Sequence, residues 1–333
     1  MAAPAGLTDE QIEFFVANNY AKLEGAIPRE LCEEWVAAGC SASGVDLADD
    51  STWGERNVRA PDFSAPMAEV APELHAAICQ LCGGAERVRA ADELRLDAGF
   101  VVNYDQGADQ PWRVPLGDHG GWHVDGDFNH FLDAPEAGLF FIFLWNDIDY
   151  QAGPTYIAPD SIPHVLSHLQ HNPEGLSAFA LRTSHNVKSA CKLSVPCMGK
   201  AGDCFLTHPQ MLHTCASHHR HHHPTAPFSS HNWLTWAAVG CDGCRSSQNI
   251  KRQPRFMRNG QVRLAAPMWT ADTLSPVERC SLRCLGQDAA AGRPRGFVPP
   301  PDELRGACDH DDGGLLPWQY GEKASFSAPI RPP

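Results

Sequence analysis

His123, Asp125 and Asp127 occupy alternate positions in residues 121–133, which read GWHVDGDFNHFLD. Alternate side chains of an extended chain point to one face, so an imidazole and a carboxylate would lie side by side there. Two histidines and one carboxylate can hold one face of an octahedral Fe(II) and leave the opposite face open. The pattern alone is also typical of a hydrogen-bonded surface pair. Gly126 predicts a bend, which would leave Asp127 as a solvated loop carboxylate.

A metal site of this kind needs a second histidine from a distant strand. The segment GDCFLTHPQMLHTCAS offers His208 and His213, five residues apart. In a regular strand the two would face opposite ways, and the proline after His208 indicates an edge or a bend. The spacing leaves both histidines open as the third ligand.

The composition limits the classes of partner. The chain has 333 residues, 43% hydrophobic and 20% charged, with a net charge of −14. This acidity argues against nucleic acid, whose binders normally show a basic face. No run of about 20 apolar residues and no signal peptide is visible, so we expect no membrane partner. The chain ends in Arg-Pro-Pro rather than a peroxisomal signal, which leaves an intracellular, cytoplasmic location as the default expectation. The sequence does not indicate the oligomeric state.

The elements that must position these residues change in character along the chain. Thr8 and Gln11 predict a capping box, Pro28 and Gly39 predict the two ends of a second helix, and a third helix is expected over 68–82. From about residue 94 short apolar runs alternate with Gly, Pro and Asp, which favours strands. The run 139–145 is apolar without alternation and predicts a central strand buried on both faces. Helices followed by strands favour an α+β chain built on an antiparallel sandwich or barrel.

The cysteines do not suggest a disulfide framework. There are 13, an odd number at irregular spacings, which favours free thiols in a reducing compartment. Two CxxC pairs occur, Cys79/Cys82 in a predicted helix and Cys241/Cys244 in a segment of unusual composition. We interpret both as thiols without a metal.

The residues resemble the phytanoyl-CoA dioxygenase-like family of Fe(II)- and 2-oxoglutarate-dependent oxygenases over roughly residues 8–288. The resemblance rests on GWHVDGDFNHFLD, LFFIFLWNDIDYQAGPTYIAPDS, AGDCFLTHPQMLH and PRFMRNGQVRL. It implies a double-stranded β-helix, a jelly-roll or cupin-like core, with the N-terminal helices packed on it. It also implies site residues: His123, Asp125 and His213 as metal ligands, and Trp145 and Asn103 at the 2-oxoglutarate.

Such enzymes also hold the far carboxylate of 2-oxoglutarate with an arginine about ten to twelve residues after the distal histidine. That window holds none here, because residues 218–247 begin with the tract HHRHHH and have no clear period. When these 30 residues are set aside, Arg255 falls 12 positions after His213. We therefore expect Arg255 to be the anchor and 218–247 to be an insertion, either a loop or translated intron. Closing a loop costs entropy that grows slowly with its length, so Arg255 can still reach the site.

The expected organisation is a single oxygenase domain over 1–288, followed by a loosely structured tail over 289–333. Within the domain, the N-terminal helices span 8–82 and the β-helix core about 94–288. The expected function is hydroxylation of a C–H bond of a small organic substrate with O2, giving succinate and CO2. A non-catalytic metal- or ligand-binding protein on the same fold is the alternative, and a cupin-like metalloenzyme without cosubstrate is a third. The fold and the motifs do not choose a substrate.

Overall fold

A computed structural model describes residues 4–53, 57–89, 94–104, 111–117, 121–126, 128–183, 187, 191–215, 249, 251–300 and 304. Outside these ranges lie Asp127, the predicted insertion 218–247 with Cys241 and Cys244, and nearly all of 301–333.

Antiparallel strands make up the centre of the molecule. The strands are β1 (Tyr20–Leu23), β2 (Asn57–Pro66), β3 (Arg95–Asn103), β4 (Asn129–His130), β5 (Leu139–Leu144), β6 (Thr155–Ala158), β7 (Leu176–Ser177), β8 (Val195–Pro196), β9 (Cys204–Thr207), β10 (Leu212–Cys215) and β11 (Arg255–Val262). Six of them form one sheet in the order β1-β9-β5-β11-β3-β2, and three form a second sheet in the order β10-β6-β8. Strands β4 and β7 pair separately.

Strand β5 lies inside the larger sheet, between β9 and β11, and all six of its residues are buried. Phe141, Phe143 and the following Trp145 belong to the hydrophobic cluster that includes the N-terminal helices. Phe140 and Ile142 face a second cluster, shared with β6 and β10. Because both faces need apolar side chains, the run shows no alternation. The predicted central strand is confirmed.

Seven helices are described, with four short 3₁₀ turns. They are α1 (Asp9–Asn18), α2 (Arg29–Ser43), α3 (Met67–Val70), α4 (Pro72–Cys82), α5 (Ile162–Gln170), α6 (Ala178–Thr183) and α8 (Pro276–Cys284), and the turns are η1 (Asp50–Thr52), η2 (Ala85–Arg87), η4 (Pro159–Ser161) and η7 (Ala289–Ala291). The capping box predicted for Thr8 and Gln11 opens α1 and is confirmed.

Two helix boundaries differ from the prediction. Helix α2 runs through Gly39 and ends at Gly44, whose φ of 67° is the left-handed conformation that closes helices. The helix predicted over 68–82 is two helices, because Ala71 precedes a proline and leaves the helical conformation. The N-terminal region is also not purely helical, since β1 and β2 form the two edges of the main sheet.

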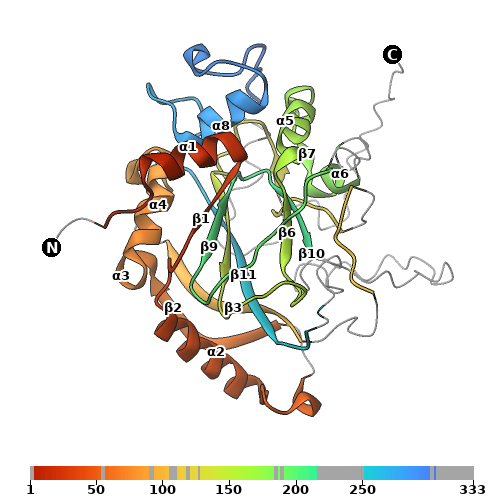
Figure 1. Cartoon of the computed structure of the whole chain (residues 1–333). Coiled ribbons are helices and arrows are strands. Elements are labelled where there is room, and N and C mark those ends of the chain that lie inside the picture. The colour runs from red at the N-terminus through yellow and green to blue at the C-terminus, as the bar shows by residue number, and fades with distance from the viewer. Residues whose placement is uncertain are drawn as a thin grey trace.

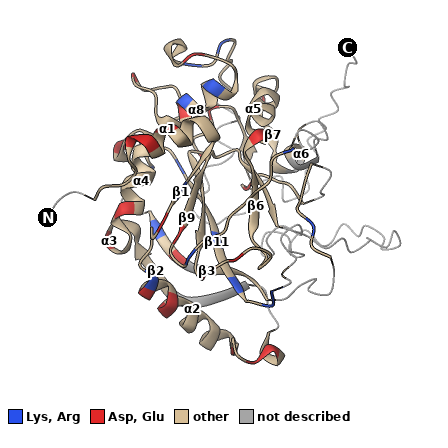
Figure 2. Cartoon of the chain, in the orientation of Figure 1, with Lys and Arg blue, Asp and Glu red and all other residues tan. Residues whose placement is uncertain are grey.

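The layers follow from these elements (Figure 1). Helices α2 and α4 pack against the main sheet, while α1 and α8 pack on each other at one end of it. The β10-β6-β8 sheet lies against the other face, through the cluster it shares with β5 and β11. Acidic residues lie on α1 and basic residues on α8 (Figure 2), and an ion pair of 2.7 Å joins Glu13 to Arg279.

The predicted α+β class is confirmed, and the strand pairings of the described residues are antiparallel. The double-stranded β-helix stays a prediction, because the sheets described do not close into a barrel. The extent of the domain and of the tail stays a prediction as well. No helix of the described ranges is long and apolar enough to cross a membrane.

Candidate active site

Two histidines and an aspartate meet beside the second sheet. His123 N donates to His213 O at 3.1 Å and His213 N donates to His123 O at 2.9 Å, so the two residues are directly opposed. Opposed residues of antiparallel chains share a face, and the ring centres lie 4.2 Å apart. Asp125 Oδ1 lies 3.4 Å from Nε2 of each ring. One ligand atom from each of the three residues lies within 4.8 Å of the others.

The local backbone explains this placement. His123 pairs with β10 through an isolated bridge rather than a full strand, but its extended chain still turns Asp125 to the same side. Gly126, with a φ of 120°, then bends the chain away, as the sequence predicted. The positive φ is open to glycine and strained for other residues.

The hydrogen bonds of the two rings orient their lone pairs. His123 Nδ1 lies 2.9 Å from the carbonyl oxygen of Gly121, and His213 Nδ1 lies 3.3 Å from that of Met211. A carbonyl only accepts, so each Nδ1 carries the proton and each Nε2 faces Asp125. A carbonyl behind the ring is the usual support of a metal-binding histidine. Electron pairs of two rings and a carboxylate thus converge on a point that calls for a cation.

Asp125 is held in its ionised form. Burial opposes ionisation, but the neighbouring rings of His213 and His123, when they carry a second proton at Nε2, attract the carboxylate and hold the pKa of Asp125 well below its usual range. A carboxylate is therefore present at this point at neutral pH, which is the form that binds a metal.

Two amides of β11 hold Asp125, and neither was predicted from the sequence. Asn259 Nδ2 donates to Asp125 Oδ2 at 3.1 Å and lies 3.3 Å from His213 Nε2. Gln261 Nε2 donates to the Asp125 backbone carbonyl at 3.0 Å. With Oδ2 occupied by an amide, Oδ1 alone faces the histidines, which favours a carboxylate bound through one oxygen. The even spacing of Arg255, Asn259 and Gln261 in RFMRNGQV, four and two residues apart, was the available signal, because it places all three on one face of a strand.

Arg255 begins the same strand and is buried, with 1% of its surface exposed. Its Nη1 donates to the Gly153 carbonyl at 2.9 Å and lies 3.8 Å from Cys215 Sγ. Among the described residues, Nε and Nη2 are buried without a hydrogen-bond partner. A buried cation without an anion is costly, so this position calls for a negatively charged ligand. Cys215 lies two residues after His213, and the contact spans a chain separation of 40 residues.

Asn103 lies directly opposite Arg255 in the pairing of β3 with β11, so their side chains share a face. Gly153 lies close to both: its carbonyl accepts from Arg255, and a Cβ on it would lie 3.1 Å from Asn103 Nδ2. Between this end and the histidines, Thr155 Oγ1 donates to Met257 Sδ at 2.8 Å. The two sheets therefore enclose a continuous row of side chains from Arg255 to Asn259.

The structure does not bring Trp145 to this row. Its ring stacks on Trp35 of α2 at 5.4 Å between centroids and meets Phe100 edge-on at 5.3 Å. It follows β5 on the side of Phe143, and that side packs on the helices. The expectation that Trp145 lines the cosubstrate pocket is therefore not supported by its packing, which is that of a core residue.

His208, the rival for the third ligand, lies elsewhere. Gln210 N donates to its Nδ1 at 3.1 Å, and its Nε2 lies 2.9 Å from Ser281 Oγ. Burial, with the charge of Arg283, lowers the pKa of His208 to about 3. It is thus a neutral core histidine, and His213 is the one beside Asp125.

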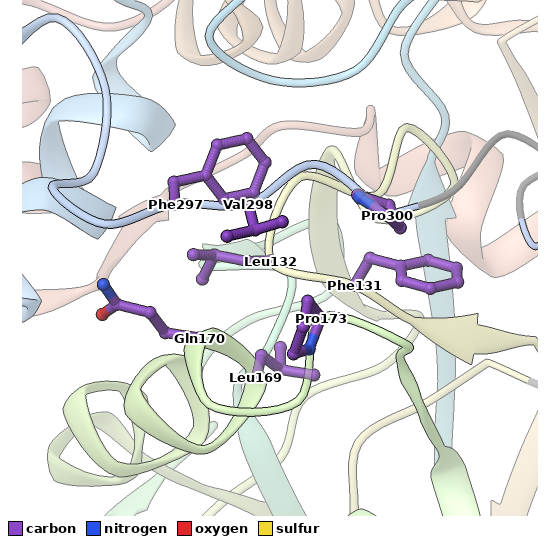
Figure 3. A pocket seen from close by; sticks show the side chains of 8 residues that line it. All are labelled: Phe131, Leu132, Leu169, Gln170, Pro173, Phe297, Val298 and Pro300. Atoms are coloured by element: carbon purple, nitrogen blue, oxygen red, sulfur yellow. The ribbon is translucent and has the colours of Figure 1, made fainter.

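A small hollow that is open to solvent lies away from these residues (Figure 3). Its lining comes from Phe131 and Leu132 after β4, from the end of α5, and from the segment 297–300. The lining is mostly apolar and contains none of the residues that surround Asp125 or Arg255. Nothing about it indicates a ligand.

No protein-family model matches the chain, and no curated protein matches it. Several solved structures resemble it at low identity. The non-heme alpha ketoglutarate dependent carbocyclase SnoK from nogalamycin biosynthesis is 15% identical over 79% of this chain and 86% of that chain, with a TM-score of 0.41. EctD from S. alaskensis with bound Fe is 17% identical over 80% of this chain and 79% of that chain, with a TM-score of 0.39. EvdO2 from Micromonospora carbonacea var. aurantiaca complexed with 2-oxoglutarate is 13% identical over 82% of this chain and 96% of that chain, with a TM-score of 0.40.

These neighbours are of the kind that the sequence resemblance leads one to expect. The superpositions are too loose to assign a fold or an activity to this chain. Its own residues have to carry the functional assignment.

Proposed function

We propose that the protein is an Fe(II)- and 2-oxoglutarate-dependent dioxygenase of the phytanoyl-CoA dioxygenase-like kind. It hydroxylates a C–H bond of a small organic substrate with O2 and releases succinate and CO2. One observation carries the proposal. On the inward face of β11, Asn259 contacts the cluster of two histidines and a carboxylate, and Arg255 has a buried guanidinium with no anion beside it among the described residues.

The donor set fits Fe(II). Two imidazole nitrogens and one carboxylate oxygen suit this ion, whereas soft thiolate ligands favour Zn(II), Cu(I) or iron–sulfur clusters. His123, Asp125 and His213 would hold the metal from one side. Because Asn259 occupies Asp125 Oδ2, the carboxylate would take one coordination position and leave the opposite face to other ligands.

The Arg255 end fits a dicarboxylate. Nε and Nη2, the two guanidinium nitrogens that have no hydrogen-bond partner among the described residues, form one edge of the fork and can bind both oxygens of a carboxylate. Along β11 the Cα atoms of Arg255 and Asn259 are roughly 13 Å apart, and the arginine side chain reaches back across part of this span. A five-carbon 2-oxo dicarboxylate has an acid at each end, one for the metal and one for Arg255.

Iron, 2-oxoglutarate and O2 would supply the oxidising power, and the chain supplies position and environment. The Nδ1 hydrogen bonds to carbonyls fix both rings. Arg255 and the side chains opposite it select the cosubstrate, and the apolar cluster of β5, β6 and β10 keeps water from the inner end of the site. Asp125 stays ionised at neutral pH.

The test is an anaerobic titration with Fe(II) and 2-oxoglutarate that follows the visible charge-transfer band of the chelate. A succinate assay in air follows. The full chain and a chain shortened by 218–247 are compared, because the histidine tract can bind iron without forming the chelate. His123→Ala should abolish the band, and the matched control His171→Ala, at the end of α5, should retain it.

The outcomes separate the candidate functions. A band with succinate supports the proposal. A band without succinate in either chain would support the alternative, a ligand-binding protein without catalysis. Two folded proteins without a band would overturn the assignment of both iron and 2-oxoglutarate.

A further inference from the structure

Two thiols and a guanidinium converge on one amide oxygen between α8 and the end of α1. Cys280 Sγ lies 3.0 Å and Cys284 Sγ 3.1 Å from Asn19 Oδ1. Arg283 Nη2 lies 2.6 Å from the same oxygen and 3.3 Å from Cys284 Sγ. The two cysteines are one helical turn apart, at the last residue of α8 and four residues before it.

This arrangement has more donors than acceptors. An amide oxygen has two lone pairs, but three donors point at Asn19 Oδ1. The amide cannot turn over to relieve this, because its Nδ2 donates to the Pro159 carbonyl at 2.7 Å. Arg283 is also fixed, since its Nε donates to the Val16 carbonyl at 2.6 Å. The cluster is satisfied when one thiol loses its proton and accepts from Arg283 instead.

Cys284 is the thiol placed to do so. It is the one that contacts the guanidinium, and it is partly exposed, whereas the other nine described cysteines are buried. Hydrogen bonding from Cys280 and the positive charge of Arg283 lower the pKa of Cys284, and they outweigh burial, which acts in the opposite direction. Burial instead raises the pKa of the thiols of Cys40 and Cys79. A thiolate with partial exposure and a basic neighbour is the reactive kind of cysteine.

We propose that Cys284 is a hydroperoxide-sensitive thiolate and that Cys280 is its resolving partner. The Cys284 thiolate attacks one oxygen of a hydroperoxide ROOH. The O–O bond breaks, an alkoxide leaves and takes up a proton as ROH, and the sulfur is oxidised to the sulfenate level as Cys284–SOH. Cys280 then attacks that sulfur after losing its proton, the S–O bond breaks, and water leaves as the disulfide forms.

The geometry makes this disulfide reversible. Cβ atoms four residues apart on a helix are about 5–6 Å apart, whereas a relaxed disulfide needs about 3.5–4.5 Å. The last turn of α8 must therefore shift, which is easiest at a helix end because fewer backbone bonds hold it there. A strained disulfide is readily reduced.

The cluster also lies close to the strand of the distal histidine. Ser281, on the same turn, contacts His208 Nε2 at 2.9 Å, and His208 N donates to the Asn19 carbonyl at 2.9 Å. His208 lies in the turn before β10. Two hydrogen bonds thus join Ser281 and Asn19, which lie beside the thiols, to that turn. The proposal does not depend on the activity of the metal centre.

The experiment uses the full chain with Cys241, Cys244 and Cys308 replaced by serine, because these lie outside the described residues. The reduced protein receives one equivalent of hydrogen peroxide with dimedone, which traps sulfenic acids, and peptides are identified by mass spectrometry. We expect a Cys280–Cys284 disulfide in this background and a dimedone adduct on Cys284 in C280S. In C284S, Cys280 should stay reduced, and circular dichroism should show that each variant unfolds cooperatively.

Alkylation of Cys284 by iodoacetamide as a function of pH tests whether Arg283 lowers the pKa of this thiol. Its midpoint should lie below that of the same cysteine in the urea-unfolded chain, and Arg283→Gln should raise it. A shift of one pH unit is a tenfold change in thiolate fraction. The proposal is wrong if the folded midpoint is not lower, or if peroxide oxidises the described cysteines without preference for Cys284.

Discussion

Replacing Arg255 by methionine should make the protein without ligand more stable, while abolishing its response to 2-oxoglutarate. Methionine keeps an unbranched chain in the same space and removes the charge. In the fold, Nε and Nη2 have no partner among the described residues, and Nη1 has the Gly153 carbonyl. A residue with a purely structural role would show the opposite sign, because removing its contacts would destabilise the fold.

The magnitudes follow from these contacts. Loss of the hydrogen bond to Gly153 costs about 1 kcal/mol. Removal of a buried charge without a counter-ion returns about 3 kcal/mol, the order of penalty seen when one partner of a buried pair is deleted. The ligand-free variant should therefore gain about 2 kcal/mol. Two charge-assisted hydrogen bonds of about 1.5–3 kcal/mol each would be lost to the ligand, a 10²- to 10⁴-fold weakening of 2-oxoglutarate.

Urea unfolding with Mn(II), with and without 2-oxoglutarate, measures both quantities. At a ligand concentration 100 times the Kd of the original protein, the original protein should gain about 2.7 kcal/mol and the variant at most about 0.4 kcal/mol. Arg258→Met is the matched control, because this residue lies on the same strand, is partly exposed and pairs with Asp97 at 3.1 Å. A less stable Arg255→Met protein that 2-oxoglutarate still stabilises would refute the reasoning.

Three further predictions concern residues around the site. Asn259→Ala should weaken Mn(II) binding about 10- to 100-fold, because a hydrogen-bond partner of a metal ligand orients that ligand. Calorimetric titration measures the affinity, and an unchanged value would show that Asn259 has no role in holding Asp125. Trp145→Leu should cost about 2–4 kcal/mol in urea unfolding, as large core truncations do, while the 2-oxoglutarate affinity per folded protein stays the same; a large loss of affinity would place Trp145 at the pocket. His208→Gln should flatten the pH dependence of stability. The folded pKa of His208, about 3, lies below its unfolded value of about 6.5, so stability is complete above pH 6.5 and is lost as pH falls toward 3. The loss is about 1.4 kcal/mol per pH unit, and urea unfolding at pH 6 and pH 4 should show it in the original protein and not in the variant.

Features that repeat over a few residues were predictable from the sequence. The i, i+2 spacing of His123 and Asp125 places them on one face whether the segment is a full strand or, as here, a single bridge. The apolar run of β5 predicted a strand with two covered faces, because it shows no alternation and is short and bounded by turn residues. The capping box of Thr8 and Gln11 is equally local, because its two hydrogen bonds join residues three apart.

Features that depend on which face meets which layer were not predictable in this way. Trp145 follows β5, and along a strand the side chains change face at every residue, so the motif around it could not assign it to the helix side or to the site side. In the sequence, Asn259 and Gln261 are ordinary polar residues of a predicted strand. Their contacts with Asp125 follow only from the position of β11 beside β5 and opposite the extended segment of Asp125. The partner of Arg255 in the pairing, Asn103, lies 152 positions earlier in the chain.

The register of β11 links the two ends of the candidate site. Gly260 pairs with Phe141, and a Cβ on Gly260 would collide with that ring. The position opposite the aromatic ring therefore needs glycine, and this contact favours one alignment of β11 on β5. In that alignment Arg255 and Asn259 both point inward. A slip of one residue would instead present Phe256 and Arg258 to the site and send both polar groups to the helix side. A single glycine on the face away from the site thus helps to position the guanidinium and the amide together.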